Sequence, residues 1–82
     1  MINLILYTSD NCGACKRAKR YLTSLNINFI EKNISNDKFA RKDLEDRYIM
    51  SIPVLVKGNW EDGIEGFSPN LYNEFLQKHN VL

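Results

Sequence analysis

The first third of the chain predicts a strand followed by a helix. Residues 2–7 are apolar or β-favouring almost without interruption, which is typical of a strand covered on both faces. A polar loop, residues 8–11, follows. From position 12 the apolar positions recur every three or four residues, which predicts a helix ending near residues 25–26. Its inward face would carry Cys15, Ala18, Leu22 and Leu25.

The middle of the chain predicts a second strand and a second helix. Residues 28–33 alternate in polarity around Ile30, which favours a strand. Residues 35–37 are Ser, Asn and Asp, the types that cap helix N-termini, so we expect a second helix after them. We expect this helix to end before Ser51, with apolar positions at Phe39, Ala40, Leu44 and Tyr48.

The last third predicts a β-hairpin and a third helix. Residues 52–56 have strand character, and residues 58–59 (Gly-Asn) are a two-residue hairpin signal before a fourth strand near residues 60–64. Ser68 offers a side-chain cap and Pro69 a first-turn proline for the final helix. That helix has an apolar stripe of Leu71, Tyr72, Phe75 and Leu76. The order β-α-β-α-β-β-α predicts an α/β fold, one mixed sheet with helices on its faces.

Length and charge narrow the function classes. A chain of 82 residues suits one domain, residues 1–82, and its 44% hydrophobic and 26% charged content is that of a globular protein. The net charge of +1 provides no global field for nucleic acid or an anionic membrane. The apolar start lacks a preceding basic residue, and no stretch approaches the length of a membrane span. We therefore expect a cytoplasmic monomer without a nucleic-acid or membrane partner.

The two cysteines are the main candidates for chemistry. Cys12 and Cys15 lie where a strand ends and a helix begins, which in a reducing compartment indicates a redox-active dithiol. The positive end of a helix stabilises an anion, so the pKa of the Cys12 thiol should fall from about 8.5 toward about 7 or below. Helical geometry turns Cys15 inward. We expect Cys12 to be the attacking nucleophile and Cys15 the resolving thiol.

Three other interpretations use the same cysteines. A structural disulfide across so short a loop would contribute only about 2 kcal/mol, and a reducing compartment disfavours it. A structural zinc site needs four ligands, and beyond the two cysteines the chain offers only the distant His79. An iron-sulfur cluster shared between two chains is the remaining alternative from a different functional class.

Charged residues and two proline-containing segments complete the candidates. Lys16 and Lys19 project near the direction of Cys12, where they would stabilise its thiolate or meet an acidic partner, or simply form a solvated face. Asp10 lies in the preceding loop and would oppose the thiolate. Pro53 fits the start of a strand. Residues 66–70 begin with a glycine, which permits close backbone approach, and lead into a helix N-terminus that suits a carboxylate.

On these residues, the chain resembles glutaredoxin-type members of the thioredoxin superfamily over essentially its whole length. The resemblance rests on three segments in matching order: Tyr7-Thr8 before Cys12, Cys15-Lys16-Arg17-Ala18-Lys19, and Ser51-Ile52-Pro53-Val54. It implies a thioredoxin fold of four strands and three helices. It also implies a cis peptide bond at Pro53 beside Cys12, and pairing of the Ile52 backbone with a substrate strand. The implied substrate contacts are Tyr7, Lys16, Ile52, Pro53, Gly66, Phe67 and Ser68.

The resemblance also bears on the electron source, with no bound cofactor implied. Glutaredoxins that use glutathione carry Pro-Tyr between the cysteines, a lysine three residues before the first cysteine and a Gly-Gly-x-Asp-Asp-like stretch before the last helix. Here those positions are residues 13–14 (Gly-Ala), Ser9 and residues 66–70 (Gly-Phe-Ser-Pro-Asn). The last segment is similar to that of NrdH-type redoxins, which are reduced like thioredoxins and serve ribonucleotide reductase. Ser68 and Asn70 replace the arginine and aspartate of that pattern. The expected electron source is therefore glutathione or thioredoxin reductase, and the expected partner a protein disulfide, with ribonucleotide reductase as a candidate.

Overall fold

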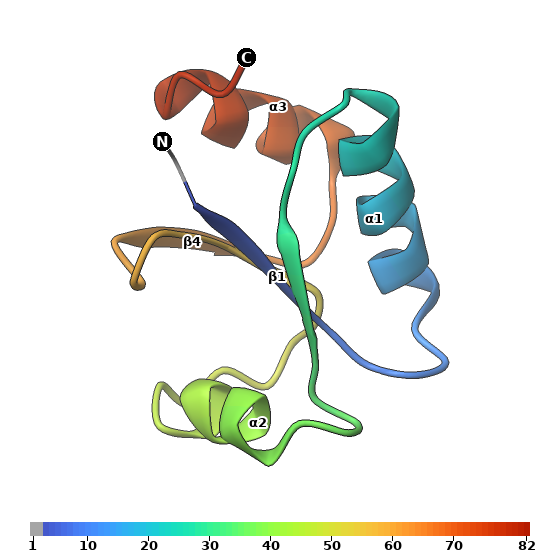
Figure 1. The fold of residues 1–82 in the computed structure, drawn as a ribbon, viewed down its shortest axis with the longest axis vertical. Coiled ribbons are helices and arrows are strands. Elements are labelled where there is room, and N and C mark those ends of the chain that lie inside the picture. Colours follow the sequence, from blue (N-terminus) through green and yellow to red (C-terminus); the bar gives the residue numbers. More distant parts are fainter. Residues whose placement is uncertain (1–2) are drawn as a thin grey trace.

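The computed structural model describes residues 3–82 and shows four strands and three helices (Figure 1). The elements are β1 (Leu4–Thr8), α1 (Gly13–Ser24), β2 (Ile30–Asn33), α2 (Lys38–Glu45), β3 (Val54–Lys57), β4 (Asp62–Glu65) and α3 (Pro69–Lys78). Their order confirms the predicted β-α-β-α-β-β-α arrangement. Ile2, the first residue of the predicted first strand, lies outside the described residues. Within residues 3–82 no helix is long and apolar enough to cross a membrane.

The sheet is mixed, with strand order β2-β1-β3-β4. β1 pairs in parallel with β2 and antiparallel with β3, which in turn pairs antiparallel with β4. The α1 crossover makes the parallel β1–β2 pair possible. In this register Thr8 at the end of β1 lies opposite Asn33 at the end of β2, while Tyr7 lies opposite Val54 at the start of β3. The loop that leads to Cys12 and the segment that contains Pro53 therefore meet at the same end of the sheet.

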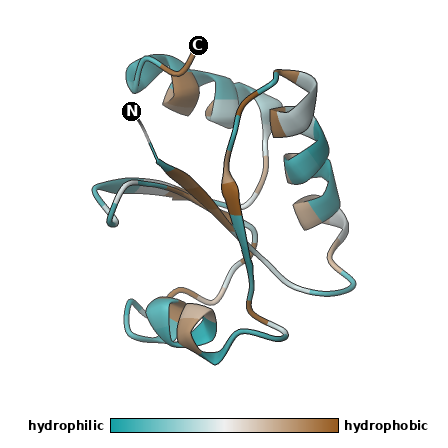
Figure 2. Cartoon of the chain, in the orientation of Figure 1, coloured by the Kyte–Doolittle hydropathy of each residue, from teal (hydrophilic) through white to brown (hydrophobic). Residues whose placement is uncertain are grey.

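Alternation along the strands divides the core into two layers. Leu4 and Leu6 of β1 face α1 and α3, where they join a cluster that includes Leu22 and Leu76. Tyr7 faces the other side and joins the cluster under α2, with Ala40, Leu44, Val54 and Val56. Figure 1 shows α2 on the opposite side of the sheet from α1 and α3, and Figure 2 shows that β1 is largely hydrophobic whereas α1 carries a strongly hydrophilic band. The burial of both strand faces explains the nearly unbroken apolar run.

Each helix is followed, two or three residues after its last residue, by a residue in the left-handed region. Asn26, Tyr48 and Asn80 have φ values of 57°, 56° and 59°. After each of them the next N–H returns to a carbonyl of the preceding helix, as from Ile49 to Leu44 at 3.0 Å, which is the hydrogen-bonding pattern of a Schellman motif. The predicted end of α1 near residues 25–26 is confirmed. The predicted length of α2 is wrong, because the helix ends at Glu45 and Tyr48 is 92% exposed instead of lying on its apolar face.

Several other local predictions need correction. β2 and β3 each begin two residues later than expected, at Ile30 and Val54. The hairpin between β3 and β4 has four loop residues, 58–61, instead of two, because Lys57 pairs with Asp62. Trp60 sits in that loop with φ 61°, and its ring packs on Tyr7 at 5.3 Å instead of extending β4.

The start of α3 also differs from its prediction. Pro69 occupies the first turn as expected, but Ser68 makes no side-chain hydrogen bond to the helix and contributes only its backbone carbonyl, which accepts from Tyr72. Of the predicted apolar stripe, Leu71 is 51% exposed, whereas Tyr72, Phe75 and Leu76 are buried. The stripe that contacts the sheet is therefore narrower than the sequence pattern suggested.

Asp62, the first residue of β4, holds the end of α3 against the sheet. Its Oδ2 atom accepts a hydrogen bond from His79 Nε2 at 2.8 Å and pairs with Lys78 Nζ at 3.0 Å. These contacts, that of His79 first, lower the pKa of the carboxyl from 3.8 to about 2. Because the folded-state pKa is depressed, the carboxylate stabilises the fold fully above its unfolded pKa, and this contribution disappears as the pH falls through the folded value.

We expect Asp62→Asn to lower the free energy of unfolding at neutral pH by about 1 kcal/mol, since solvent screens a partly exposed site. The variant should also lose less stability than wild type as the pH falls from about 4 to about 2. Urea unfolding at several pH values measures both effects. Asp46→Asn is the matched control, because Asp46 pairs with Lys42 on an exposed surface at 3.2 Å. If Asp62→Asn retained the acid sensitivity of wild type, the assigned role of Asp62 would be wrong.

Candidate functional site: a dithiol at the start of α1

Cys12 is the N-cap residue of α1. Its backbone is extended, with φ −112° and ψ 107°, and its Sγ atom accepts a hydrogen bond from the N–H of Cys15 at 3.1 Å. The N–H of Lys16 reaches the Cys12 carbonyl at 3.2 Å and forms the first turn of the helix. The sulfur of Cys12 thus lies at the positive end of the helix dipole, where a thiolate is stabilised by the dipole and by a backbone donor.

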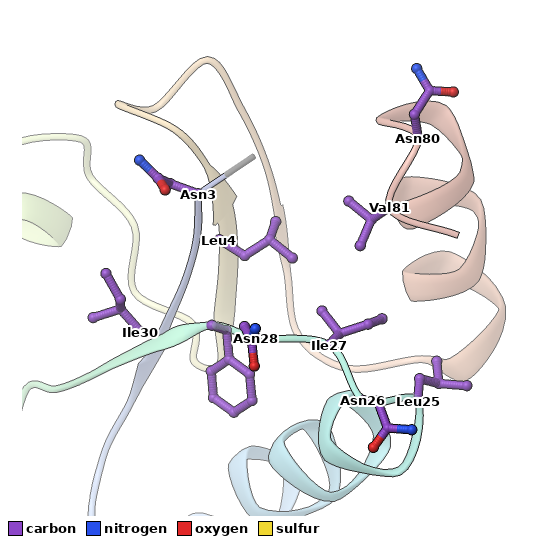
Figure 3. A pocket seen from close by; sticks show the side chains of 10 residues that line it. Asn3, Leu4, Leu25, Asn26, Ile27, Asn28, Ile30, Asn80 and Val81 are labelled. Atoms are coloured by element: carbon purple, nitrogen blue, oxygen red, sulfur yellow. The ribbon is translucent and has the colours of Figure 1, made fainter. Parts of the chain in front are cut away.

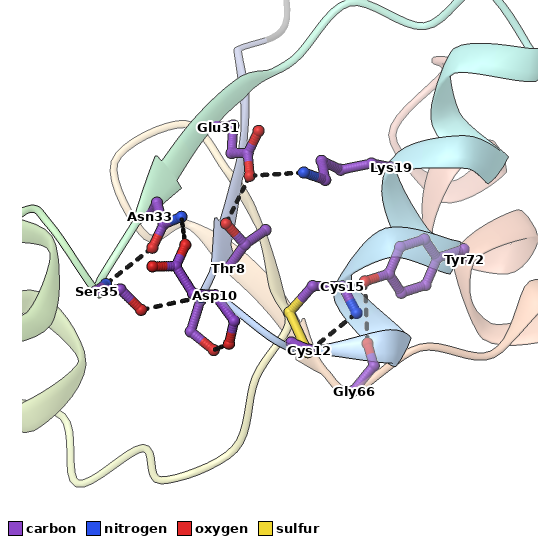
Figure 4. Close-up of a disulfide and its surroundings, with 11 residues drawn as sticks. Thr8, Asp10, Cys12, Cys15, Lys19, Glu31, Asn33, Ser35, Gly66 and Tyr72 are labelled. Carbon is purple, nitrogen blue, oxygen red and sulfur yellow. Dashed lines mark hydrogen bonds and ion pairs between the residues drawn. A yellow bond between two sulfur atoms is a disulfide. The ribbon is translucent and has the colours of Figure 1, made fainter.

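Cys12 and Cys15 are joined as a disulfide (Figure 4) with their Cα atoms 5.2 Å apart. The two residues differ in exposure. Cys15 is 1% exposed and shares the buried face of α1 with Ala18 and Leu22, whereas Cys12 is only half-buried. The predicted difference in burial is confirmed, and Cys12 is the member of the pair that a partner molecule can reach.

The cis peptide bond implied at Ile52-Pro53 is confirmed. Pro53 is buried and Ile52 is half-buried. The Pro53 carbonyl accepts the N–H of Gly66 at 2.7 Å, and the Gly66 carbonyl accepts the hydroxyl of Tyr72 at 2.9 Å. Gly66 and Tyr72 are among the residues that surround the disulfide in Figure 4. Two segments that contain predicted substrate contacts, around Pro53 and Gly66, are therefore joined by a backbone hydrogen bond.

Phe67, another predicted substrate contact, packs against two helices. Its ring meets Tyr72 of α3 edge-on with centroids 4.9 Å apart, and Tyr21 of α1 at 5.7 Å. Phe67 and Ser68 are both half-buried, so each keeps some surface for a ligand. The positions of Gly66, Phe67 and Ser68, three of the predicted substrate contacts, are thus compatible with contact to a substrate.

Lys19 does not face Cys12 as its helical position suggested. Its Nζ atom lies 3.1 Å from Oε2 of Glu31 in β2, and the same oxygen accepts the hydroxyl of Thr8 at 2.7 Å (Figure 4). The Thr8 hydrogen bond and then Lys19 lower the pKa of Glu31 below its usual 4.5. Sequence reasoning missed Thr8 and Glu31. The available signal was a polar residue ending a buried strand beside a carboxylate on the next strand.

Arg17 lies against the turn between the cysteines. Its Nη1 atom is 3.4 Å from the position that a Cβ atom at Gly13 would occupy. Lys16, the basic residue predicted to contact a substrate, is exposed. The side chain placed against the dithiol turn is therefore that of Arg17, which the sequence analysis named only within the segment Cys15-Lys16-Arg17-Ala18-Lys19.

Asp10 is a loop residue, as predicted, and it fastens the dithiol loop to the end of β2. Its Oδ1 atom accepts from the Asn33 side chain at 2.9 Å, and its N–H donates to the Ser35 hydroxyl at 2.9 Å. The Ser35 N–H in turn donates to Asn33 Oδ1 at 2.8 Å (Figure 4). The loop before Cys12 is thus braced by residues that follow β2.

Tyr7 was expected to contact the substrate, and the structure corrects this expectation because the residue is buried. Its side chain is 1% exposed and lies under α2, where the hydroxyl donates to Asp43 Oδ2 at 3.0 Å. Burial, followed by the contact with Asp43, raises the pKa of the phenol to about 12. Strand alternation turns Tyr7 away from the side of the sheet that carries Cys15, so the motif residue is a core residue here.

One cavity of the described chain is distant from the dithiol. It has a volume of about 620 Å³ and lies at the start of β1 and the end of α1, whereas Cys12 follows the end of β1 (Figure 3). The cavity is lined by Asn3, Leu4, Leu25, Asn26, Ile27, Asn28, Phe29, Ile30, Asn80 and Val81.

Within residues 3–82, no group of three or more His, Cys, Asp or Glu side chains is arranged so that it could hold a metal ion.

Similarity to known proteins in sequence and in fold identifies the family of this chain. Residues 4–60 match the Glutaredoxin family. An uncharacterized glutaredoxin-like 8.6 kDa protein in the rubredoxin operon of Clostridium pasteurianum is 31% identical over 75 residues, covering 89% of this chain and 96% of the relative. The NrdH-redoxin of Escherichia coli has the same fold, with a TM-score of 0.78 at 24% identity over 88% of this chain and 92% of its own. A thioredoxin of Fasciola hepatica reaches 0.76 at 14% identity, over 95% of this chain and 80% of its own.

These matches agree with the arrangement around the cysteines, a dithiol at the start of the first helix of a four-stranded mixed sheet. The chain therefore belongs to the glutaredoxin family of the thioredoxin superfamily, and it is a thiol-disulfide oxidoreductase that carries the cysteine pair Cys12 and Cys15.

Proposed function

We propose that this protein reduces disulfides of other proteins, with Cys12 as the attacking nucleophile and Cys15 as the resolving thiol. The observation that carries the proposal is the unequal placement of the two sulfurs. Cys12 is partly exposed and its Sγ accepts a backbone N–H at the start of α1, whereas Cys15 is 1% exposed behind it. A partner disulfide therefore meets Cys12 first.

The reaction consists of two thiol-disulfide exchanges. The Cys12 thiolate attacks one sulfur of the substrate disulfide, a Cys12–substrate bond forms, and the other substrate sulfur leaves as a thiolate that takes up a proton. Cys15 then loses its proton and attacks the Cys12 sulfur. This step forms the Cys12–Cys15 disulfide and releases the second substrate thiol. Two electrons pass from the protein to the substrate, and a reductant must return them before the next cycle.

The substrate rim consists of Lys16, Ile52, Pro53, Gly66, Phe67 and Ser68. Ile52 forms no backbone hydrogen bond within residues 3–82, so its N–H and C=O are available to an extended substrate segment. The hydrogen bond between the Pro53 carbonyl and the Gly66 N–H fixes the two sides of this rim relative to each other. A short strand of the substrate would add to the Ile52 backbone and present its disulfide to Cys12.

The electrons come from thioredoxin reductase rather than from glutathione in this proposal. Ser9 stands where glutathione-dependent relatives carry a lysine, and Asp10 presents a carboxylate held by Asn33 where a glutathione carboxylate would need a cation. The E. coli NrdH-redoxin is described as having a thioredoxin-like activity profile. Ribonucleotide reductase is the candidate protein substrate, the cytoplasm the proposed location, and the protein acts as a monomer.

The electron source is tested by coupling reduction of a protein disulfide to NADPH oxidation through either thioredoxin reductase or glutathione with glutathione reductase. We expect turnover with thioredoxin reductase to exceed that with glutathione by about tenfold or more, the effect of about 1.4 kcal/mol of lost ion pairing and added repulsion. Ser9→Lys combined with Asp10→Asn should raise the glutathione-dependent rate. Faster turnover of wild type with glutathione would reverse the proposed electron source and leave the dithiol mechanism intact.

A further inference from the structure

A second, smaller groove lies beside the dithiol, between α1 and the segment that leads into α3. Its volume is about 310 Å³, and it is lined by Arg17, Arg20, Tyr21, Ser24 and Phe67. It begins next to the redox pair, because Arg17 Nη1 lies 3.4 Å from the position of a Cβ atom on Gly13, between the two cysteines. One end of the groove therefore lies at the turn between the two cysteines, and its lining extends from Arg17 along α1 to Ser24.

The floor of the groove is aromatic and firmly supported. Tyr21 and Phe67 meet edge-on at 5.7 Å, and both contact Tyr72, at 6.2 Å and 4.9 Å. Tyr72 is fully buried and its hydroxyl is bonded to the Gly66 carbonyl. Since the aromatic rings hold one another in place, an apolar side chain of a ligand would find a preformed contact surface.

The charged side chains among the residues that line the groove are two arginines, Arg17 and Arg20. α1 contains four basic residues, Lys16, Arg17, Lys19 and Arg20, and no acidic residue. Lys19 is paired with Glu31. In the described part of the chain, Arg17 and Arg20 form no ion pair, so their guanidinium groups remain available for carboxylates, which they bind in a bidentate geometry.

We propose that this groove docks an acidic segment of the protein whose disulfide is reduced, with its carboxylates on Arg17 and Arg20 and an aromatic or aliphatic side chain on Tyr21 and Phe67. The inference rests on the proposed function. Charge complementarity selects an acidic ligand, and the aromatic floor selects one with a large apolar side chain, which glutathione lacks. Docking here would steer an acidic partner to Cys12 and set specificity without taking part in the exchange reaction.

The test uses two synthetic disulfide peptides that differ only in the residues flanking Leu next to the disulfide, Asp and Glu in one and Asn and Gln in the other. We expect wild type to reduce the acidic peptide with a kcat/KM about tenfold higher. Arg20→Gln should lower this ratio about threefold through KM with kcat retained, and high salt should lower it too. Arg41→Gln, the same change at an exposed position of α2, should leave the ratio at its wild-type value.

Other outcomes would overturn the docking proposal. Equal kcat/KM for both peptides, with reduction intact, would remove the groove from partner recognition and leave the proposed function standing. If Arg41→Gln lowered the ratio as much as Arg20→Gln, overall charge and not this groove would set the preference. A higher KM for glutathione in Arg20→Gln, with an unchanged peptide ratio, would assign the groove to glutathione. Failure to reduce either peptide would overturn the proposed function, and the docking proposal with it.

Discussion

Cys12→Ser is expected to abolish disulfide reduction, with a loss of roughly a thousandfold or more in turnover, the scale of removing an enzyme nucleophile. A serine hydroxyl remains protonated at neutral pH and forms no disulfide bond with a substrate sulfur. Cys15 does not replace it, because Cys15 is 1% exposed. Reduction of a protein disulfide, followed with dithiothreitol as the source of electrons, measures the effect.

The same substitution should leave the fold intact, which makes the loss of activity interpretable. Serine is among the preferred N-cap residues, and its hydroxyl can accept the Cys15 N–H that Cys12 Sγ accepts now. The appropriate reference is the reduced wild-type protein, because the variant has no disulfide. Thermal unfolding of the two should agree closely. Retention of full reductase activity by Cys12→Ser would show that another group is the nucleophile.

In the proposed mechanism, a lowered thiol pKa alone would not account for the contribution of Cys12. A shift from about 8.5 to about 7 raises the thiolate fraction at neutral pH roughly sixteenfold, but the lower basicity removes about fivefold of nucleophilic reactivity. The net gain is about threefold. The larger effects are that Cys12 is a good leaving group in the second exchange and that Cys15 lies one helical turn away. Charged neighbours such as Arg17 should therefore change the rate of a simple disulfide only modestly.

Features encoded by neighbouring residues were predictable from the sequence. The periodicity of residues 12–25 specified both α1 and the inward direction of Cys15, and the same spacing placed Cys12 at the open end. The end of α1 was also accessible, since Asn26 is a residue type that tolerates the left-handed region. Tyr48 occupies the equivalent position after α2, where its side chain gives no such indication, so the predicted helix was too long.

Features that depend on contacts across the sheet were not predictable. Thr8 and Glu31 are 23 residues apart and meet only because β1 and β2 are parallel neighbours. Tyr7 belongs to the motif on which the resemblance rests, yet its position in β1 directs the ring under α2, into the core. Arg17 and Phe67 come together only when α1 and the segment before α3 pack on the same face. Sequence patterns therefore locate the two cysteines better than they locate the side chains that come together around them.

The second prediction with a large effect concerns Cys15→Ser, which should trap the substrate on Cys12. Removal of the resolving thiol leaves the first exchange intact, because Cys12 keeps its place at the start of α1. The second exchange then depends on an external thiol instead of one held 5.2 Å away between Cα atoms. Turnover should fall about a hundredfold or more at millimolar thiol, since intramolecular attack has a far higher effective concentration.

Mass spectrometry after exposure of Cys15→Ser to a peptide dimer joined by one intermolecular disulfide should show a near-stoichiometric adduct on Cys12 with the mass of one of the two peptides. Because serine adds a polar group at a buried position, Cys15→Ala provides a second variant with the same missing thiol and no new hydroxyl. Cys12→Ser is the matched control and should form no adduct, since its remaining thiol is buried. Absence of an adduct in both Cys15 variants would exclude the resolving role of Cys15. An adduct on Cys15 in the Cys12→Ser protein would reverse the two assignments, and it would require that the buried face of α1 opens to admit a substrate.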